Sequence, residues 1–152
     1  MKFRLVDKII ECRENEYITG EKALSLEEYF LLRPSGHKDI FPPTLMAEAL
    51  FQLANFLIFK TFNNKLGHLV MFKKIIFHGT MKPGDVLVMR IDLMSIIDDA
   101  VILNGSGSIN GMVVIEGIDC MAKLFDIEKL INPVKYGILF DNLFASTYDG
   151  TS

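Results

Sequence analysis

Apolar and polar residues alternate along several stretches of the chain, a spacing typical of β-strands with one face in a core and the other in water. In residues 86–97, every second residue from Leu87 to Leu93 is apolar, with Arg90 and Asp92 between them. Similar apolar stretches predict further strands over residues 3–12, 16–24, 66–77, 101–109 and 112–124. Asn110-Gly111 separates the last two, and this dipeptide favours the type I′ turn of a tight hairpin.

Residues 43–62 are apolar on nearly all sides and predict one long helix. Pro42 and Pro43 suit its first turn, because the N–H group that proline lacks has no partner there, and Asn63-Asn64 is expected to end it. Such a helix must be enclosed by other structure. The order of elements, two strands, one helix and four strands, therefore predicts an α+β domain with a curved antiparallel sheet around one central helix.

The C-terminal extension, residues 125–152, follows the last predicted strand and carries many apolar side chains. Asp126 is expected to cap a helix, and Pro133 to interrupt it before an apolar turn or short helix. We expect residues 1–124 to form one domain and the C-terminal extension to pack back on it. The alternative is that the extension covers a neighbouring subunit.

Composition narrows the class of protein. The chain has 152 residues, 50% of them hydrophobic, and its net charge of -3 without a basic run argues against binding to nucleic acid. Polar residues interrupt the apolar helix, so no membrane span is expected. The N-terminus does not resemble a signal peptide, and Cys12 and Cys120 show no disulfide or metal-ligand spacing, which favours a cytoplasmic location. No motif calls for a metal or nucleotide, so no cofactor is expected.

A polar stripe interrupts the predicted helix at Glu48, Gln52 and Asn55, which helical spacing places on one face. One interpretation is that Glu48 is a partly exposed residue that stabilises the first turns through the helix dipole, with Gln52 beside it. The other is that Glu48 lies in an apolar tunnel and acts as a general acid or base. A tunnel of this kind would also suit an acyl chain.

Two short motifs narrow the class of protein further. Residues 41–51 read FPPTLMAEALF and are followed by Gln52, and residues 77–85 read FHGTMKPGD. These motifs resemble the patterns PG-V-L-x-x-E-A-x-x-Q and FRRPVxPGD of the bacterial 3-hydroxyacyl-(acyl carrier protein) dehydratases. The positions of the first motif in register are Pro42, Leu45, Glu48, Ala49 and Gln52. The likeness extends over roughly residues 3–124, and the order of the motifs is more specific than either alone.

This resemblance implies a hotdog fold and a homodimer, or a higher oligomer of dimers, with active sites at the subunit interface. It implies acyl thioesters of acyl carrier protein or CoA as partners, and removal of water from a 3-hydroxyacyl thioester in the biosynthesis of fatty acids or related acyl chains. Glu48 matches the carboxylate that handles the departing hydroxyl group. The candidate substrate contacts are Gln52, Phe41, Leu45, Phe51 and Gly79.

The chain departs from the family pattern at two catalytic positions. Pro34 stands opposite the family's catalytic histidine, and the histidine of this loop, His37, lies three positions farther on. Pro43 replaces a glycine whose N–H helps to bind the thioester carbonyl, and proline has no N–H to donate. Loss of one such donor costs about 100-fold or more in rate. We therefore take Glu48 and a displaced His37 as the candidate catalytic pair and expect autonomous dehydration to be reduced or absent.

Three functions remain open on this basis. The first is a divergent dehydratase acting on acyl carrier protein thioesters. The second is an acyl-thioester-binding subunit without chemistry of its own, or a partner of a histidine-bearing homologue. The third is a hotdog thioesterase in which the helix carboxylate activates water. Candidate docking residues for the acidic carrier protein are the basic side chains Arg33, Lys38, Lys73, Lys74 and Lys82.

Overall fold

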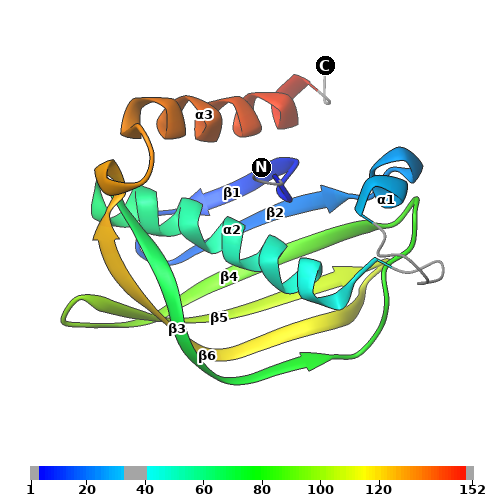
Figure 1. The fold of residues 1–152 in the computed structure, drawn as a ribbon, viewed down its shortest axis with the longest axis horizontal. Helices are drawn as coiled ribbons and strands as arrows, with labels where there is room; N and C mark the ends of the chain where they lie inside the picture. Colours follow the sequence, from blue (N-terminus) through cyan, green and yellow to red (C-terminus); the bar gives the residue numbers. More distant parts are fainter. Residues whose placement is uncertain (1–3, 33–40, 150–152) are drawn as a thin grey trace.

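The computed structural model describes residues 4–32 and 41–149. Six strands form one antiparallel sheet in the order β1-β2-β4-β5-β6-β3 (Figure 1). Their bounds are β1 Lys8–Arg13, β2 Tyr17–Ala23, β3 Lys65–Phe77, β4 Val86–Ile97, β5 Ala100–Ile109 and β6 Met112–Asp126. The helices are α1 Leu26–Leu32, α2 Pro43–Phe62, η1 Ile127–Lys129, which is a single 3-10 turn, and α3 Pro133–Asp149. The α+β architecture predicted from the sequence is confirmed.

The sheet bends around α2 because several of its strands contain register shifts. Four of the five strand pairs have at least one such shift, as between Leu69 and Met71 on β3 and between Leu103 and Gly105 on β5. An extra residue in one strand bends that strand and increases its twist. These irregularities let long strands curve across the helix instead of forming a flat layer (Figure 1).

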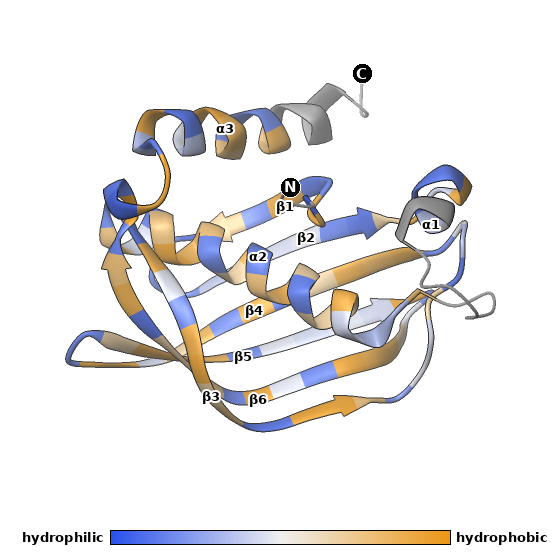
Figure 2. Cartoon of the chain, viewed as in Figure 1, coloured by the Kyte–Doolittle hydropathy of each residue, from blue (hydrophilic) through white to orange (hydrophobic). Residues whose placement is uncertain are grey.

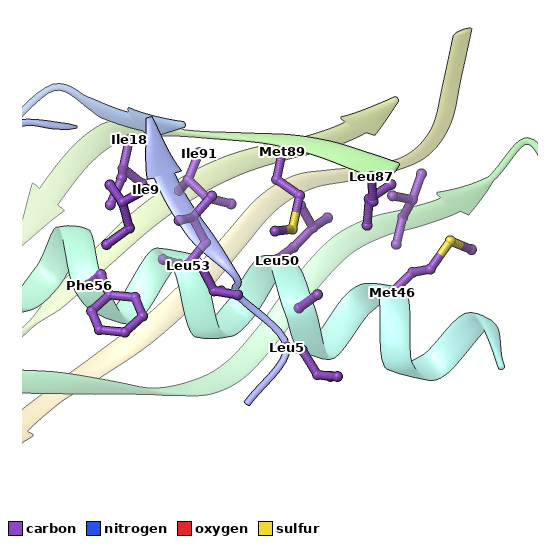
Figure 3. Packing of buried hydrophobic residues seen from close by; sticks show 14 of the residues in the cluster. Leu5, Ile9, Ile18, Met46, Leu50, Leu53, Phe56, Leu87, Met89 and Ile91 are labelled. Atoms are coloured by element: carbon purple, nitrogen blue, oxygen red, sulfur yellow. The ribbon is translucent and has the colours of Figure 1, made fainter. Parts of the chain in front are cut away.

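The core lies between α2 and the inner face of the sheet. Eight residues of α2 are buried, and in Figure 2 hydrophobic segments alternate with hydrophilic ones along this helix. Figure 3 shows helix side chains meeting those of the sheet, among them Met46, Leu50 and Leu53 from α2 and Leu87, Met89 and Ile91 from β4. By length and composition α2 is apolar enough to cross a membrane, but its enclosure by the sheet accounts for that composition.

Local sequence signals end the elements where expected. Asn63 and Asn64 both have positive φ angles, 54° and 61°, so the chain leaves the helical conformation directly after Phe62. Asn110 and Gly111, at φ 52° and 82°, form the tight hairpin turn between β5 and β6. Asparagine and glycine tolerate this left-handed conformation better than other residues do.

The short helix α1 is attached to the sheet by a buried ion pair. Ser25 Oγ accepts a hydrogen bond from the backbone N–H of Glu28 at 3.1 Å, and so caps the first turn. The ammonium group of Lys22 on β2 is almost fully buried and lies 2.6 Å from both carboxylate oxygens of Glu28. Asp7 is a second partner at 3.6 Å. Three parts of the chain therefore meet at one buried cation.

The C-terminal extension differs from its expected form. Asp126 makes no side-chain capping bond; its carboxylate pairs with Lys65 instead. Pro133 does not interrupt a helix but is the first residue of the 17-residue helix α3. Asn132 caps that helix, since its side-chain oxygen accepts hydrogen bonds from the N–H groups of the second and third helical residues. The expectation of an Asp126 cap and a short helix is wrong, because the preceding Asn132 supplies the cap and proline is well suited to a first turn.

Helix α3 packs on the second half of α2 and on β1 (Figure 1). The ring of Tyr136 stacks on Phe56 with 4.9 Å between centroids and meets Phe59 edge-on at the same distance. Phe140 and Leu143 are each only 5% exposed. The division of the chain into a domain of residues 1–124 and an extension stays a prediction.

Candidate functional site

The polar stripe of α2 borders a groove of about 740 Å³. Its walls come from the N-terminal segment at Arg4 and Leu5, the first residues of β3, the end of β6, and the segment from Leu130 to Leu139. The structure thus brings four of the candidate site residues, Glu48, Gln52, Leu45 and Phe51, to one cavity.

Two members of the stripe hold the backbone in place. The side-chain oxygen of Gln52 accepts a hydrogen bond from the N–H of Leu5 at 2.7 Å, and that of Asn55 accepts one from the N–H of Gly67 at 2.7 Å. Gln52 therefore fastens the N-terminal segment across α2, and Asn55 fastens the start of β3. The side-chain nitrogen of Gln52 lies 3.5 Å from a carboxylate oxygen of Glu48, a long contact that orients the carboxylate only weakly.

Glu48 lies on the first half of α2 with its side chain exposed at the edge of the groove. In a single chain the carboxylate is therefore exposed to water and also borders a cavity. Its position lets the carboxylate contact a ligand that lies along the groove. Burial of Glu48 at a subunit interface stays a prediction.

The start of α2 lacks one of the donors that helix starts usually offer. Pro42 occupies the N-cap, where it makes no side-chain capping bond, and Pro43 is the first helical residue. The N–H of Leu45 donates to the carbonyl oxygen of Pro42 at 2.9 Å. Pro43 cannot polarise a thioester carbonyl here, since it has no N–H. Pro34 and His37 lie outside the described residues.

The two other histidines lie away from Glu48. His68 lines the groove and stacks on Phe125 with 4.1 Å between centroids. The residue before it, Gly67, donates its N–H to Asn55 on α2. Asn55 comes seven residues after Glu48, which is about 10 Å along the helix axis. His68 thus lies near the other end of the polar stripe from Glu48. His78 lies on the surface and pairs with Glu116 at 3.0 Å.

A second cavity, about 70 Å³ and almost wholly apolar, lies between α2 and the inner face of β3 to β6. Ala47, Leu50 and Ala54 line it from the helix, and Gly105 and Gly117 from the sheet. Phe51 lines both this apolar cavity and the groove at Glu48. The two spaces therefore share one aromatic side chain.

Two of the proposed substrate contacts are placed elsewhere. Phe41 is fully buried in the core, and its backbone N–H donates to Met81 at 2.7 Å. Gly79 lies against Val114, where an added Cβ would come within 3.0 Å of that side chain. Neither residue lines the groove or the apolar cavity. The family motif indicated where these residues fall in the chain, but not that both would lie outside these two spaces.

The cysteines are poor candidates for a nucleophile. Burial raises the pKa of Cys12 to about 11, although the nearby ammonium of Lys60 opposes this shift. Burial also raises the pKa of Cys120, which lines the apolar cavity. Only the thiolate is reactive, and a raised pKa keeps both groups as thiols near neutral pH.

The basic candidates for carrier docking are scattered. Lys73 and Lys74 lie on the exposed middle of β3, and Lys82 lies in the turn before β4, where its N–H donates to Asp85. Arg33 and Lys38 lie outside the described residues. Sequence reasoning missed two other cations, Arg4 and Lys135, which line the groove itself. No motif could have indicated them, because the groove forms between the two ends of the chain.

Comparison with known proteins gives consistent results. The family model of FabA-like domains matches residues 1–118. The chain is 31% identical over 130 residues to the 3-hydroxyacyl-[acyl-carrier-protein] dehydratase FabZ of Hydrogenobaculum, covering 83% of this chain and 87% of that protein. FabZ of Clostridium botulinum is 32% identical over 116 residues, covering 75% and 81%. FabZ of Vibrio cholerae is 28% identical over 126 residues, covering 80% and 79%.

Solved structures share the fold at low sequence identity. A hot-dog-like protein from Thermanaerovibrio acidaminovorans superposes with a TM-score of 0.62 at 14% identity, covering 78% of this chain and 87% of that one. The fluoroacetyl-CoA thioesterase FlK gives 0.62 at 11% identity, covering 78% and 92%. A Streptococcus mutans protein bound to acetyl CoA gives 0.65 at 8% identity, covering 83% and 94%. The predicted hotdog fold is confirmed.

Proposed function

This chain belongs to the family of FabA-like domains, and from that premise we propose that it binds acyl thioesters in the groove beside α2 and acts on them as a 3-hydroxyacyl-(acyl carrier protein) dehydratase. The observation that carries the proposal is the position of Glu48. It occupies the family's carboxylate position on the central helix, and its side chain lies at the edge of a groove large enough for a pantetheine-linked acyl group.

Dehydration breaks the C2–H and C3–O bonds of the substrate and forms a double bond between these carbons. A base takes the C2 proton, and an acid protonates the hydroxyl group so that it leaves as water. We assign the second role to Glu48, whose carboxyl group would contact the C3 hydroxyl from the groove edge. The base is His37 of the same chain or of a partner subunit.

Binding of the rest of the substrate is distributed along the groove. Leu45 and Phe51 offer apolar contact near Glu48, and Arg4 and Lys135 offer positive charge for the phosphate of the carrier arm. Gln52 is a positioning residue: its side chain binds the backbone of the N-terminal segment, and this segment forms one wall of the groove. Pro43 leaves the thioester carbonyl without the family's backbone donor, which is expected to lower the rate about 100-fold or more.

The site is proposed to be completed in a homodimer formed along β3. This strand is the edge of the sheet, and seven consecutive residues, His68 to Lys74, are exposed although alternation would bury every second one. They include Leu69, Val70, Met71 and Phe72, which are 39% to 59% exposed. A long apolar edge strand is prone to pair with another strand, and a second copy of this chain would satisfy it.

Pro43 also favours a second candidate function, an acyl-thioester-binding subunit that depends on a histidine-bearing homologue for turnover. Crotonyl-CoA and crotonyl-acyl carrier protein test both candidates, because their hydration reverses the proposed dehydration and consumes the absorbance of the enoyl thioester. Turnover by the chain alone supports the dehydratase. Turnover only after mixing with a FabZ homologue whose helix carboxylate has been replaced supports the binding subunit.

The Glu48→Gln variant provides the decisive control. We expect it to lower turnover at least about 100-fold, both for the chain alone and for the mixture with the FabZ homologue. The unfolding midpoint should change little, because Glu48 is exposed. Glu14→Gln, an exposed carboxylate in the β1–β2 turn, should leave turnover unchanged. Full activity of Glu48→Gln would remove this carboxylate from the mechanism. Calorimetry that detects no binding of either thioester would overturn both candidates.

A further inference from the structure

The apolar cavity under α2 is held open by small residues on both sides. The helix contributes Ala47 and Ala54, and the sheet contributes Gly105 and Gly117, which are paired across β5 and β6. A Cβ on Gly105 would come within 2.9 Å of Ile91 and 3.7 Å of Leu50, so a larger residue there would intrude on the packing beneath the helix. An unfilled apolar space of this kind in a closely packed core can accept an apolar ligand.

The polar groups near the cavity are already bonded. The side-chain oxygen of Asn104, which lines it, accepts a hydrogen bond from the N–H of Asp119 at 2.8 Å. Cys120 contributes a thiol that burial keeps protonated. The cavity therefore offers contacts to hydrocarbon and little to a polar ligand.

The position of Phe51 connects the cavity to the proposed chemistry. Glu48 and Phe51 are three residues apart on α2, hence neighbours on the helix surface, and both line the groove. Phe51 also lines the apolar cavity, which extends from there under the helix. A ligand with its thioester at Glu48 and its acyl chain directed under α2 would meet the ring of Phe51 at the boundary.

We propose that Phe51 sets the acyl-chain length that the protein accepts. The end of a short acyl chain occupies the apolar cavity, and the ring of Phe51 restricts the passage so that longer chains do not fit. The apolar cavity measures about 70 Å³ and the groove about 740 Å³, so the cavity has room for the end of a short acyl chain rather than for a long one. This inference rests on the proposed binding of acyl thioesters.

The test compares the affinities of butyryl-CoA, octanoyl-CoA and dodecanoyl-CoA by calorimetry. The wild-type protein should bind dodecanoyl-CoA no more tightly than butyryl-CoA. Phe51→Ala removes six ring carbons and should bind dodecanoyl-CoA at least about tenfold more tightly than wild type, because each further buried methylene changes the binding constant about fourfold. Affinity for butyryl-CoA should fall rather than rise, because the variant also loses the contact of the Phe51 ring in the groove. Phe51→Leu should show a smaller gain in the same direction and serves if Phe51→Ala does not fold.

Three further experiments locate the effect. Phe59→Ala removes the same side chain from the same helix, but Phe59 contacts Tyr136 and lines neither space, so the preference for chain length should stay that of wild type. Adding Ala47→Leu to Phe51→Ala should refill the cavity and abolish the gain. In a Cys12→Ser background, dodecanoyl-CoA should slow alkylation of Cys120 in Phe51→Ala, since the tail would then lie beside this thiol.

The outcomes separate this inference from the proposed function. If wild type binds none of the three thioesters, acyl-thioester binding itself is overturned. If wild type binds them but Phe51→Ala and Phe51→Leu keep its chain-length profile, only the role of Phe51 is overturned. The same conclusion follows if wild type already prefers dodecanoyl-CoA.

Discussion

At the scale of single residues, Lys22 is the one charged residue that is buried among those that the structure describes. It is 1% exposed and is neutralised by Glu28 on α1 and Asp7 before β1. A buried charge is tolerated only when paired, so removal of a partner costs more than the pair contributes. Asp7 also accepts a hydrogen bond from the N–H of Ala23 at 2.7 Å. Glu28 is therefore the main ionic partner of Lys22.

We expect Glu28→Ala to lower the free energy of unfolding by about 2 to 3 kcal/mol, less than a fully unpaired buried charge would cost because Asp7 remains at 3.6 Å. Urea denaturation measures this change. Glu27→Ala is the matched control, because Glu27 lies on the same helix with its side chain exposed, and should cost at most about 0.5 kcal/mol. Equal effects of the two substitutions would show that the ion pair contributes little.

Cys12 provides a test of burial through its pH dependence. Burial raises its pKa from an ordinary value near 9 to about 11, so the folded protein holds the proton more tightly than the unfolded chain does. The resulting stabilisation is fully present below pH 9 and is lost as the pH rises towards 11. With Cys120→Ser as background, reaction of Cys12 with a disulfide reagent should be slow at pH 8 and accelerate up to pH 9.5 without levelling off. A plateau near pH 9 would mean that the thiol is not desolvated.

At the scale of elements, helix α3 lies past the region of family likeness and still helps to form the groove. The family match ends at residue 118, whereas Lys135, Tyr136 and Leu139 line the groove from α3. Burial raises the pKa of Tyr136, and its ring packs between α2 and α3. The wall of the groove therefore depends on the packing of α3.

Phe140→Ala tests that packing. Phe140 is 5% exposed, lies 6.0 Å from Phe56 between ring centroids, and has the ammonium of Lys60 over its ring, so we expect a loss of about 2 to 4 kcal/mol in urea denaturation. Ile138→Ala, at a 54% exposed position of the same helix, should change stability by less than about 0.5 kcal/mol. If both variants unfold at the same urea concentration as wild type, α3 does not stabilise the domain.

At the scale of the whole molecule, the proposed dimer follows from the free edge of β3. Phe72→Glu should dissociate it, because a charge would be placed among apolar side chains that two copies would bury together. Light scattering measures the mass of the particle. Ile97→Glu is the control, since Ile97 is equally exposed, 51% for each, but lies at the β4–β5 turn. A dimer that survives Phe72→Glu would place the interface elsewhere.

The same edge affects how carrier docking is tested. Lys73 and Lys74 lie on the exposed part of β3, so reversing their charge could lower carrier binding by disturbing the dimer. Arg4 and Lys135, in the groove, are better placed for a test of charge attraction to acyl carrier protein. Docking at any of these residues stays a prediction.

Most elements of the fold were determined by local sequence. The alternation in residues 86–97 predicted β4 with its bounds, Asn110-Gly111 predicted the hairpin, and Pro43 with Asn63 predicted the two ends of α2. These signals act over a few residues through φ preferences, missing donors and the side on which a side chain lies. Helix geometry alone likewise placed Glu48, Gln52 and Asn55 on one face.

The uses of those residues were decided only by the tertiary structure. Gln52 and Asn55 bind the backbone at Leu5 and Gly67, partners 47 and 12 residues away in the sequence. The groove forms where the N-terminal segment, α2 and α3 meet, and Phe51 borders two spaces because the sheet carries glycines opposite the helix. Such contacts depend on which segments the sheet curvature brings together, and periodicity within one element carries no information about that arrangement.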